Sequence, residues 1–143
     1  MRILIEIQNA GREQSGIKKE KSDCTVRALA TGMGIPYREA HQTLKALGRR
    51  NGAGTVVHRE WLDNHPFTTK MSVGGSYTLA HLLTDYPTGT YLVNVPKHIL
   101  TVIDGVIYDN HFDSKYLHQP IYFLWKIGFN PDKLEAVKFK IRT

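Results

Sequence analysis

The sequence contains one cysteine, Cys24, in 143 residues. A single thiol cannot form an intramolecular disulfide, so we expect a reducing compartment such as the cytoplasm. The most apolar short run, 121–125, is far too short to span a bilayer, and no membrane partner is expected. The N-terminal residues 1–8 alternate in polarity and no small-residue cleavage site follows a long apolar stretch, which predicts a strand instead of a signal peptide.

Tight metal-ligand motifs are also missing. None of the seven histidines forms a pattern such as H-E-x-x-H, and with one cysteine a metal site would need histidines and carboxylates. The glycine-rich basic segment 48–56 lacks the G-x-x-x-x-G-K-[ST] pattern of phosphate-binding loops, so an ordinary loop is favoured. We therefore expect no metal and no organic cofactor.

The net charge is +6, which favours acidic partners, including nucleic acid, only as a non-specific tendency. The basic residues cluster near 18–21, 49–50 and 138–142, and solvated surface is their commoner role. Because no basic–aromatic stacking pattern or known module accompanies them, nucleic-acid binding has no motif to support it.

Hydrophobic periodicity predicts a single α+β domain over 1–143, with N-terminal helices packed on an antiparallel sheet. Ser22 is the expected N-cap of the first helix, Gly32 and Gly34 are expected to end it, and Ser76 or Thr78 is expected to cap the fourth. The expected helices are 23–33, 37–49, 60–64 and 78–84, and the expected strands are 2–8, 90–95, 99–103, 106–108, 121–127 and 136–141.

Cys24 is expected in the first turn of the first helix. Backbone N–H groups there have no intrahelical partners and the helix dipole is positive, so both stabilise a thiolate or a nearby oxyanion. The alternative is a small buried apolar cysteine, which is the usual environment of a lone cysteine.

His98 stands at the open end of a hairpin whose turn is Asp104-Gly105. A turn centred on these two residues pairs His98 with His111 and makes Asp109 its diagonal neighbour on the same face. A base near the thiol and a carboxylate fixing that base are what nucleophilic catalysis needs. A one-residue bulge would instead favour Asn110.

The segments SDCTVRALA at 22–30, GIPY at 34–37 and VIDGVIYD at 102–109 resemble a group of small phage-encoded proteins. That group is similar to papain-like cysteine peptidases, and among them to peptidases that trim bacteriocin leaders. The resemblance implies a papain-like fold, a nucleophilic Cys24, a general base His98 and an orienting Asp109. Lys18 stands where papain-like enzymes have an oxyanion-hole glutamine; Gln14 is the replacement we favour, with Gln8 as the alternative.

The resulting hypothesis is a thiol hydrolase, a cysteine peptidase or isopeptidase, with a Cys24–His98–Asp109 catalytic triad. It would act on a peptide or protein substrate, and a phage-encoded enzyme would meet host proteins in the host cytoplasm. Two alternatives remain: a non-catalytic phage protein that binds a host protein on a papain-like scaffold, and a basic nucleic-acid-binding domain.

Overall fold

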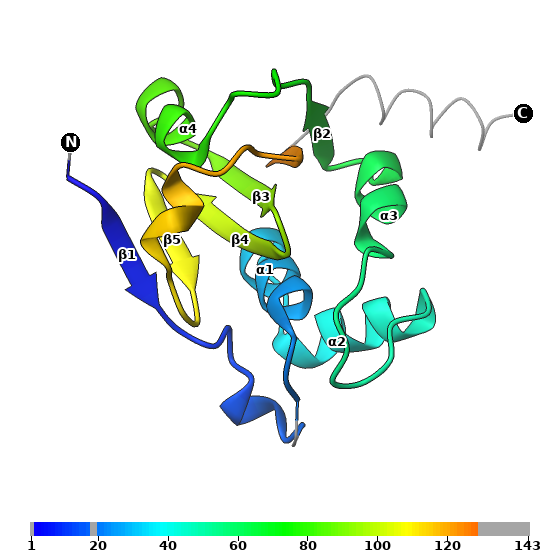
Figure 1. The fold of residues 1–143 in the computed structure, drawn as a ribbon. Coiled ribbons are helices and arrows are strands. Elements are labelled where there is room, and N and C mark those ends of the chain that lie inside the picture. The colour runs from blue at the N-terminus through cyan, green and yellow to red at the C-terminus, as the bar shows by residue number, and fades with distance from the viewer. Residues whose placement is uncertain (1, 18–19, 129–143) are drawn as a thin grey trace, which may run out of the picture.

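The protein has a mixed α+β fold, in which helices cover a six-stranded sheet (Figure 1). The structure is a computed structural model that describes residues 2–17 and 20–128. The helices in this part are α1 (Cys24–Met33), α2 (Tyr37–Ala46), α3 (His58–Asn64) and α4 (Leu79–Asp85), with 3₁₀ turns η1 (Glu13–Ser15) and η2 (Ser114–Leu117). The strands are β1 (Leu4–Ile7), β2 (Thr68–Met71), β3 (Thr90–Val95), β4 (His98–Ile103), β5 (Val106–Asp109) and β6 (Phe123–Ile127).

The sheet order is β1-β5-β4-β3-β6-β2. Neighbouring strands are antiparallel except β1, which pairs in parallel with β5. The expected antiparallel sheet is therefore corrected at this edge. Parallel pairing requires a long crossover, and α1, α2 and the strands that follow supply it before the chain returns as β5.

Side chains alternate between the two faces of the sheet and build a hydrophobic cluster on each. Leu92, Ile99 and Trp125 pack with the helices α1 and α2 on one face. Tyr91, Val93, Leu100 and others pack with α4 on the opposite face. α1 lies between the sheet and α2 (Figure 1), so its first turn is held at the end of the central strands.

Close contact between α1 and β3 depends on Gly32. A Cβ at this position would lie 2.5 Å from Leu92 Cδ2, and Leu92 is fully buried. Gly32 is therefore an interior helix residue, and the expectation that it helps to end α1 is wrong. Gly34, with φ 66°, is the C-cap that ends the helix.

The other differences from the sequence-based expectations lie at element ends and at one edge. Strand β2 was not predicted, because its sequence TTKM is short and largely polar. Helix 37–49 ends at Ala46, and strand 121–127 begins at Phe123. The expected strand 136–141 lies outside the described residues. In the described part of the chain, no helix has the length and apolar character needed to cross a membrane.

The hairpin between β4 and β5 forms with the predicted register. Asp104 and Gly105 both have positive φ, 49° and 78°, as a two-residue hairpin turn of type I′ requires. Thr101 pairs with Tyr108, and Ile103 with Val106. The Asp104 carboxylate also accepts a hydrogen bond of 2.8 Å from the Gly89 N–H, which ties this turn to the start of β3.

Replacing the turn glycine tests how strongly the hairpin is specified. Gly105→Ala is expected to lower the free energy of unfolding by about 1–2 kcal/mol, because an L-residue at this φ is strained. Urea denaturation measures the change. The control is Gly75→Ala, since Gly75 has ordinary φ and an added Cβ meets nothing within 4 Å. Equal stability of the two variants would contradict the expectation.

Candidate active site

Cys24 is the first residue of α1 and its side chain is partly exposed. The N-cap is Asp23 and not the predicted Ser22, which lies one residue earlier with φ 51°. The Asp23 side chain makes no capping hydrogen bond, because it is engaged by other side chains. The predicted placement of the thiol in the first helical turn is confirmed, so the sulfur lies at the positive end of the α1 dipole.

The Cys24 thiol lies beside the His98 imidazole and interacts with it, although 74 residues separate them in a chain of 143. Burial raises the pKa of the Cys24 thiol, but the His98 hydrogen bond, a backbone hydrogen bond from Ile99 and the charges of His98 and Arg27 outweigh it and lower the pKa. Burial also lowers the pKa of His98, whereas its hydrogen bonds to Asp109 and Cys24 raise it to about 9. These opposite shifts favour a thiolate beside an imidazolium at neutral pH.

Asp109 holds the imidazole from the other side. His98 Nε2 donates to Asp109 Oδ2 over 2.5 Å, which leaves Nδ1 for the thiol. The carboxylate belongs to Asp109 and not to Asn110, because the hairpin has no bulge and keeps the diagonal pairing predicted from the sequence. Burial raises the pKa of Asp109, and the hydrogen bonds from His98 and Arg27 lower it below its ordinary range.

Arg27 extends the network into α1. Its Nη1 donates to Asp109 Oδ1 over 3.0 Å, and its Nε donates to Asp23 Oδ1 over 3.0 Å. Asp23 also accepts hydrogen bonds from Tyr37 and Arg12. The sequence analysis did not identify Arg27, although Asp23 and Arg27 have the i,i+4 spacing that places two residues on one helix face.

Two further contacts fix the segment that carries His98. Tyr116 stacks on the imidazole, with ring centroids 4.5 Å apart and planes 9° from parallel. The Asn94 amide donates to the carbonyls of Val95 and His98, and Asn94 Oδ1 lies 3.2 Å from His58 Nε2. Burial and the charge of Arg59 lower the pKa of His58 to about 4 against the effect of Asn94, so this histidine is neutral and donates to Asn94.

A cavity of about 250 Å³, which we call the cysteine cleft, opens beside the thiol. Cys24 and Thr25 border it on the α1 side, and the β3–β4 turn borders it on the sheet side. The other lining residues are Gly54, Thr55, Val56, Arg59, Asn94, Val95, Lys97, His98, Ile99 and Tyr122. The thiol is therefore accessible from a space large enough for a few atoms of a ligand.

The structure does not bring Gln14 to the cysteine cleft. Gln14 lies on the 3₁₀ turn η1, exposed to solvent, so the predicted oxyanion role is corrected. Gln8 lines a separate cavity of about 10 Å³ that also touches Cys24, and its Oε1 accepts from the Ala10 N–H. Neither glutamine lines the cysteine cleft; backbone N–H groups at the start of α1 are the donors beside the sulfur.

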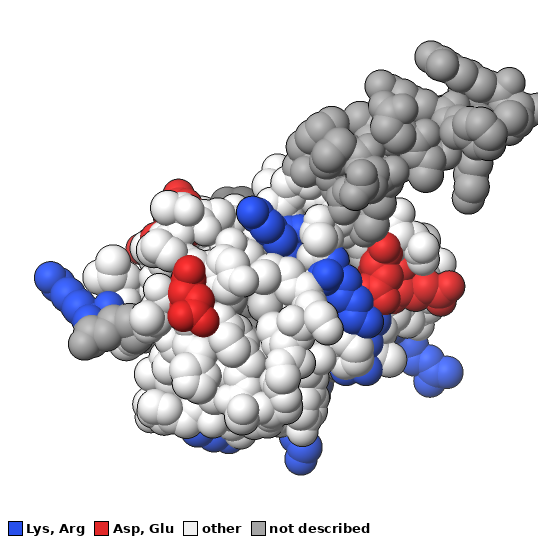
Figure 2. All heavy atoms as spheres, turned by 90° about the horizontal axis from the view of Figure 1, so that it is seen from above, with Lys and Arg blue, Asp and Glu red and all other residues white. Residues whose placement is uncertain are grey.

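The glycine-rich segment 48–56 is hydrogen-bonded to a carboxylate of the chain itself, the Glu20 side chain. Arg49 and the Gly52 N–H both donate to the Glu20 carboxylate, and His41 Nε2 lies 2.7 Å from it. The loop donors are thus already used by Glu20. The contact with Glu20 gives the buried His41 a structural role. On the face seen in Figure 2, lysine and arginine side chains lie in several separate places, and one of these groups lies directly beside acidic side chains.

Comparison with known proteins returned no matching family model, no curated relative and no solved structure. Within residues 2–17 and 20–128, no group of three or more His, Cys, Asp or Glu side chains is arranged to hold a metal ion. The functional assignment therefore depends on the geometry of the cysteine, histidine and aspartate.

Removing the imidazole is expected to raise the pKa of Cys24. In the wild-type protein, thiolate ultraviolet absorbance should appear with a midpoint below the ordinary cysteine value, because His98 stabilises the thiolate. In His98→Ala the midpoint should rise above that value, since burial then dominates. A pH titration of the absorbance measures both, with Cys24→Ala as the blank. Unchanged midpoints would show that the imidazole does not act on the thiol.

Removing the carboxylate charge is expected to lower the pKa of His98. Asp109→Asn keeps the side-chain shape but removes the charge that raises this pKa to about 9. Burial then favours the neutral ring, so the pKa of His98 should fall clearly below 9. NMR titration of the His98 ring protons measures the shift, and Asp113→Asn is the control because Asp113 pairs with Lys115 on η2. Equal shifts in both variants would contradict the expectation.

Proposed function

We propose that the protein is a thiol hydrolase of the papain-like type that cleaves amide bonds in peptides or proteins. Cys24 is the nucleophile, His98 the general base and acid, and Asp109 the residue that orients His98. The observation that carries the proposal is the juxtaposition of the Cys24 thiol with the His98 imidazole, which is itself hydrogen-bonded to the Asp109 carboxylate, at the edge of an accessible cleft.

The first half of the reaction is acyl transfer to sulfur. The Cys24 thiolate attacks the carbonyl carbon of the amide and forms a C–S bond. The His98 imidazolium gives its proton to the nitrogen of the leaving amine as the C–N bond breaks. The products are a free amine and a thioester on Cys24.

The second half restores the thiolate. His98, now neutral, removes a proton from water, and the hydroxide adds to the thioester carbon as the C–S bond breaks. The carboxylic acid product leaves, and the cysteine and histidine return to a thiolate and an imidazolium. Asp109 holds Nε2–H throughout, so Nδ1 faces the sulfur and the substrate in both steps.

Charge on the carbonyl oxygen develops next to the first turn of α1. Backbone N–H groups in this turn have no partner within the helix, and the helix dipole is positive there. Thr25 lines the cysteine cleft directly after the nucleophile. These donors support stabilisation of the oxyanion without a glutamine.

The arrangement also supports the papain-like fold that the sequence resemblance implied. The cysteine begins a central helix, and this helix packs against the antiparallel strands that carry the histidine and the carboxylate. In the chain, the helix that carries the cysteine, α1, precedes the strands that carry the histidine and the carboxylate, β4 and β5. This order agrees with that resemblance.

Peptide hydrolysis tests the proposal. Purified protein is incubated with a mixed peptide library, and new termini and a Cys24 thioester are detected by mass spectrometry. Cys24→Ala should abolish cleavage, and His98→Ala should lower the rate roughly a hundredfold to ten-thousandfold. His111→Ala is the matched control, since His111 is exposed on the neighbouring strand end. Cleavage that survives in Cys24→Ala would refute the proposal.

A further inference from the structure

The cysteine cleft is bordered by cations and by no carboxylate. Among its lining residues Arg59, Lys97 and His98 carry or accept positive charge, and none is aspartate or glutamate. Asp109, the carboxylate closest to His98 in the network, has a buried side chain that is already engaged by His98 and Arg27. The cleft therefore offers positive charge beside the thiol.

Arg59 is the least satisfied of these cations. Its Nε is buried without a hydrogen-bond partner, and within the described residues it forms no ion pair. Its guanidinium carbon lies 4.3 Å from the centre of the Phe123 ring, which holds the group in place without neutralising it. Although Nε itself is shielded, the Arg59 side chain is partly exposed and lines the cysteine cleft, so its positive charge faces a bound ligand without an internal counter-ion.

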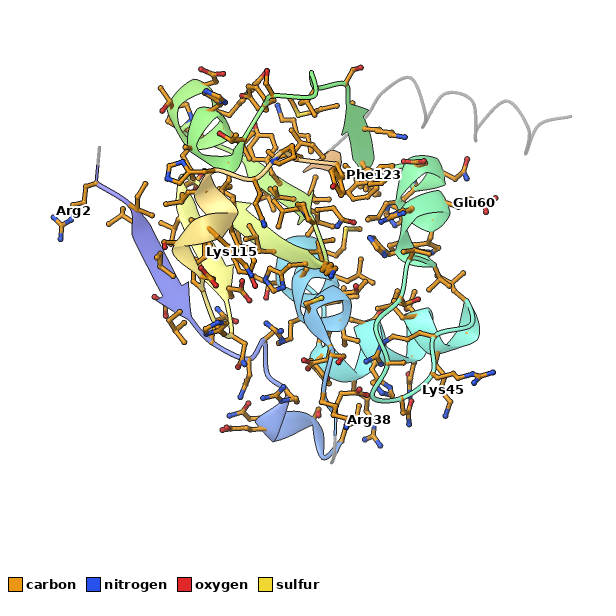
Figure 3. All side chains as sticks on the ribbon, in the orientation of Figure 1. Arg2, Arg38, Lys45, Glu60, Lys115 and Phe123 are labelled. Atoms are coloured by element: carbon orange, nitrogen blue, oxygen red, sulfur yellow. The ribbon has the colours of Figure 1, made fainter. Side chains whose placement is uncertain are left out.

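The two acidic residues of α3 do not provide that counter-ion. Asp63, one turn after Arg59, accepts from Trp125 Nε1 and pairs with Lys70. Glu60 lies on the outer side of α3, pointing away from the sheet, whereas Phe123 lies next to α3 at the sheet (Figure 3). Glu60 lines a second cavity of about 710 Å³, which shares Val56 and Arg59 with the cysteine cleft. Arg59 thus stands where the two cavities meet, with its neighbour's carboxylate turned outward.

We infer that Arg59 is a specificity-determining residue that binds a carboxylate of the substrate, so that the enzyme prefers peptides with an acidic group close to the cleaved bond. This inference rests on the proposed function. The carboxylate is either an aspartate or glutamate side chain or the C-terminal group of the peptide. Arginine suits both, because its planar guanidinium donates two parallel hydrogen bonds to a carboxylate.

The first test uses two alkylating reagents of similar size that differ in charge. Iodoacetate carries a carboxylate and iodoacetamide does not, and both form a thioether with Cys24 as iodide leaves. The ratio of their second-order rate constants, followed by intact mass, reports the preference for an anion. Arg59→Gln should lower this ratio on the order of tenfold, because a charge-assisted hydrogen bond is lost while the side-chain stem is retained.

Controls separate the role of Arg59 from general charge and from folding. Arg59→Lys should keep only part of the ratio, because the charge remains but the two parallel hydrogen bonds are lost, whereas Arg38→Gln, a change on the exposed face of α2, should leave it unaltered. In the wild-type protein the ratio should also fall as salt rises, because screening weakens the attraction. A ratio that is the same in wild-type and Arg59→Gln protein, or that is insensitive to salt in the wild type, would overturn the inference.

Protection from iodoacetamide distinguishes the two sources of the carboxylate. Acetyl-Ala-Asp-Ala-amide is compared with acetyl-Ala-Asn-Ala-amide for the side chain, and acetyl-Ala-Ala with its amide for the C-terminus. Selective protection by one acidic peptide, lost in Arg59→Gln, identifies the source; no selective protection by either overturns the inference. Failure of the proposed function looks different, since both reagents would then alkylate Cys24 at the rate of an ordinary thiol.

Discussion

The Asp109 carboxylate is shared between two cations that come from different parts of the chain. One oxygen accepts from His98 on the neighbouring strand, and the other accepts from Arg27 on α1. Because the Asp109 side chain is fully buried, these hydrogen bonds and a third from the Asn110 N–H to Oδ1 offset its desolvation. This carboxylate therefore fixes the position of α1 relative to the β4–β5 hairpin, and the thiol and the imidazole are brought together as a consequence.

The hydrophobic core contributes to the same geometry. Leu29 and Ala30 of α1 pack with Leu92 and Ile99 of the sheet, and Gly32 lets the helix approach β3 closely. The packing of α1 determines where the Cys24 thiol lies. The turn between β4 and β5 determines that Asp109 is the strand residue that faces His98. The polar network then selects one arrangement among those that the apolar contacts would allow, because every member has a defined partner.

The features that the sequence predicted well are local ones. The place of Cys24 in the first turn of α1, the Asp104-Gly105 turn and the diagonal pairing of His98 with Asp109 follow from helical periodicity, turn chemistry and strand alternation, although the cap is Asp23 and not the predicted Ser22. The features that it did not predict are set by residues distant in the chain. Three examples are the parallel pairing of β1 with β5, the short polar strand β2, and the contact of Arg27 with Asp109. Each joins segments that are distant in the sequence, and no local sequence pattern predicts such a contact. Gln14 was misplaced for a similar reason, because its direction depends on how the loop before α1 folds.

The free-energy cost of burying the charges of Asp109 and Arg27 bears on whether the network is catalytic or structural. A buried ion-pair series contributes little net stability, since well-packed apolar side chains of similar volume often serve as well or better. A cysteine needed only for packing gains nothing from a neighbouring imidazole, and a binding surface has no use for a thiol with a lowered pKa. Hydrolysis needs all three features at one place: a thiolate, a proton donor beside it, and a cleft that admits an acyl group. The desolvation of Asp109 and Arg27 therefore supports the proposed hydrolase over a purely structural role for the network.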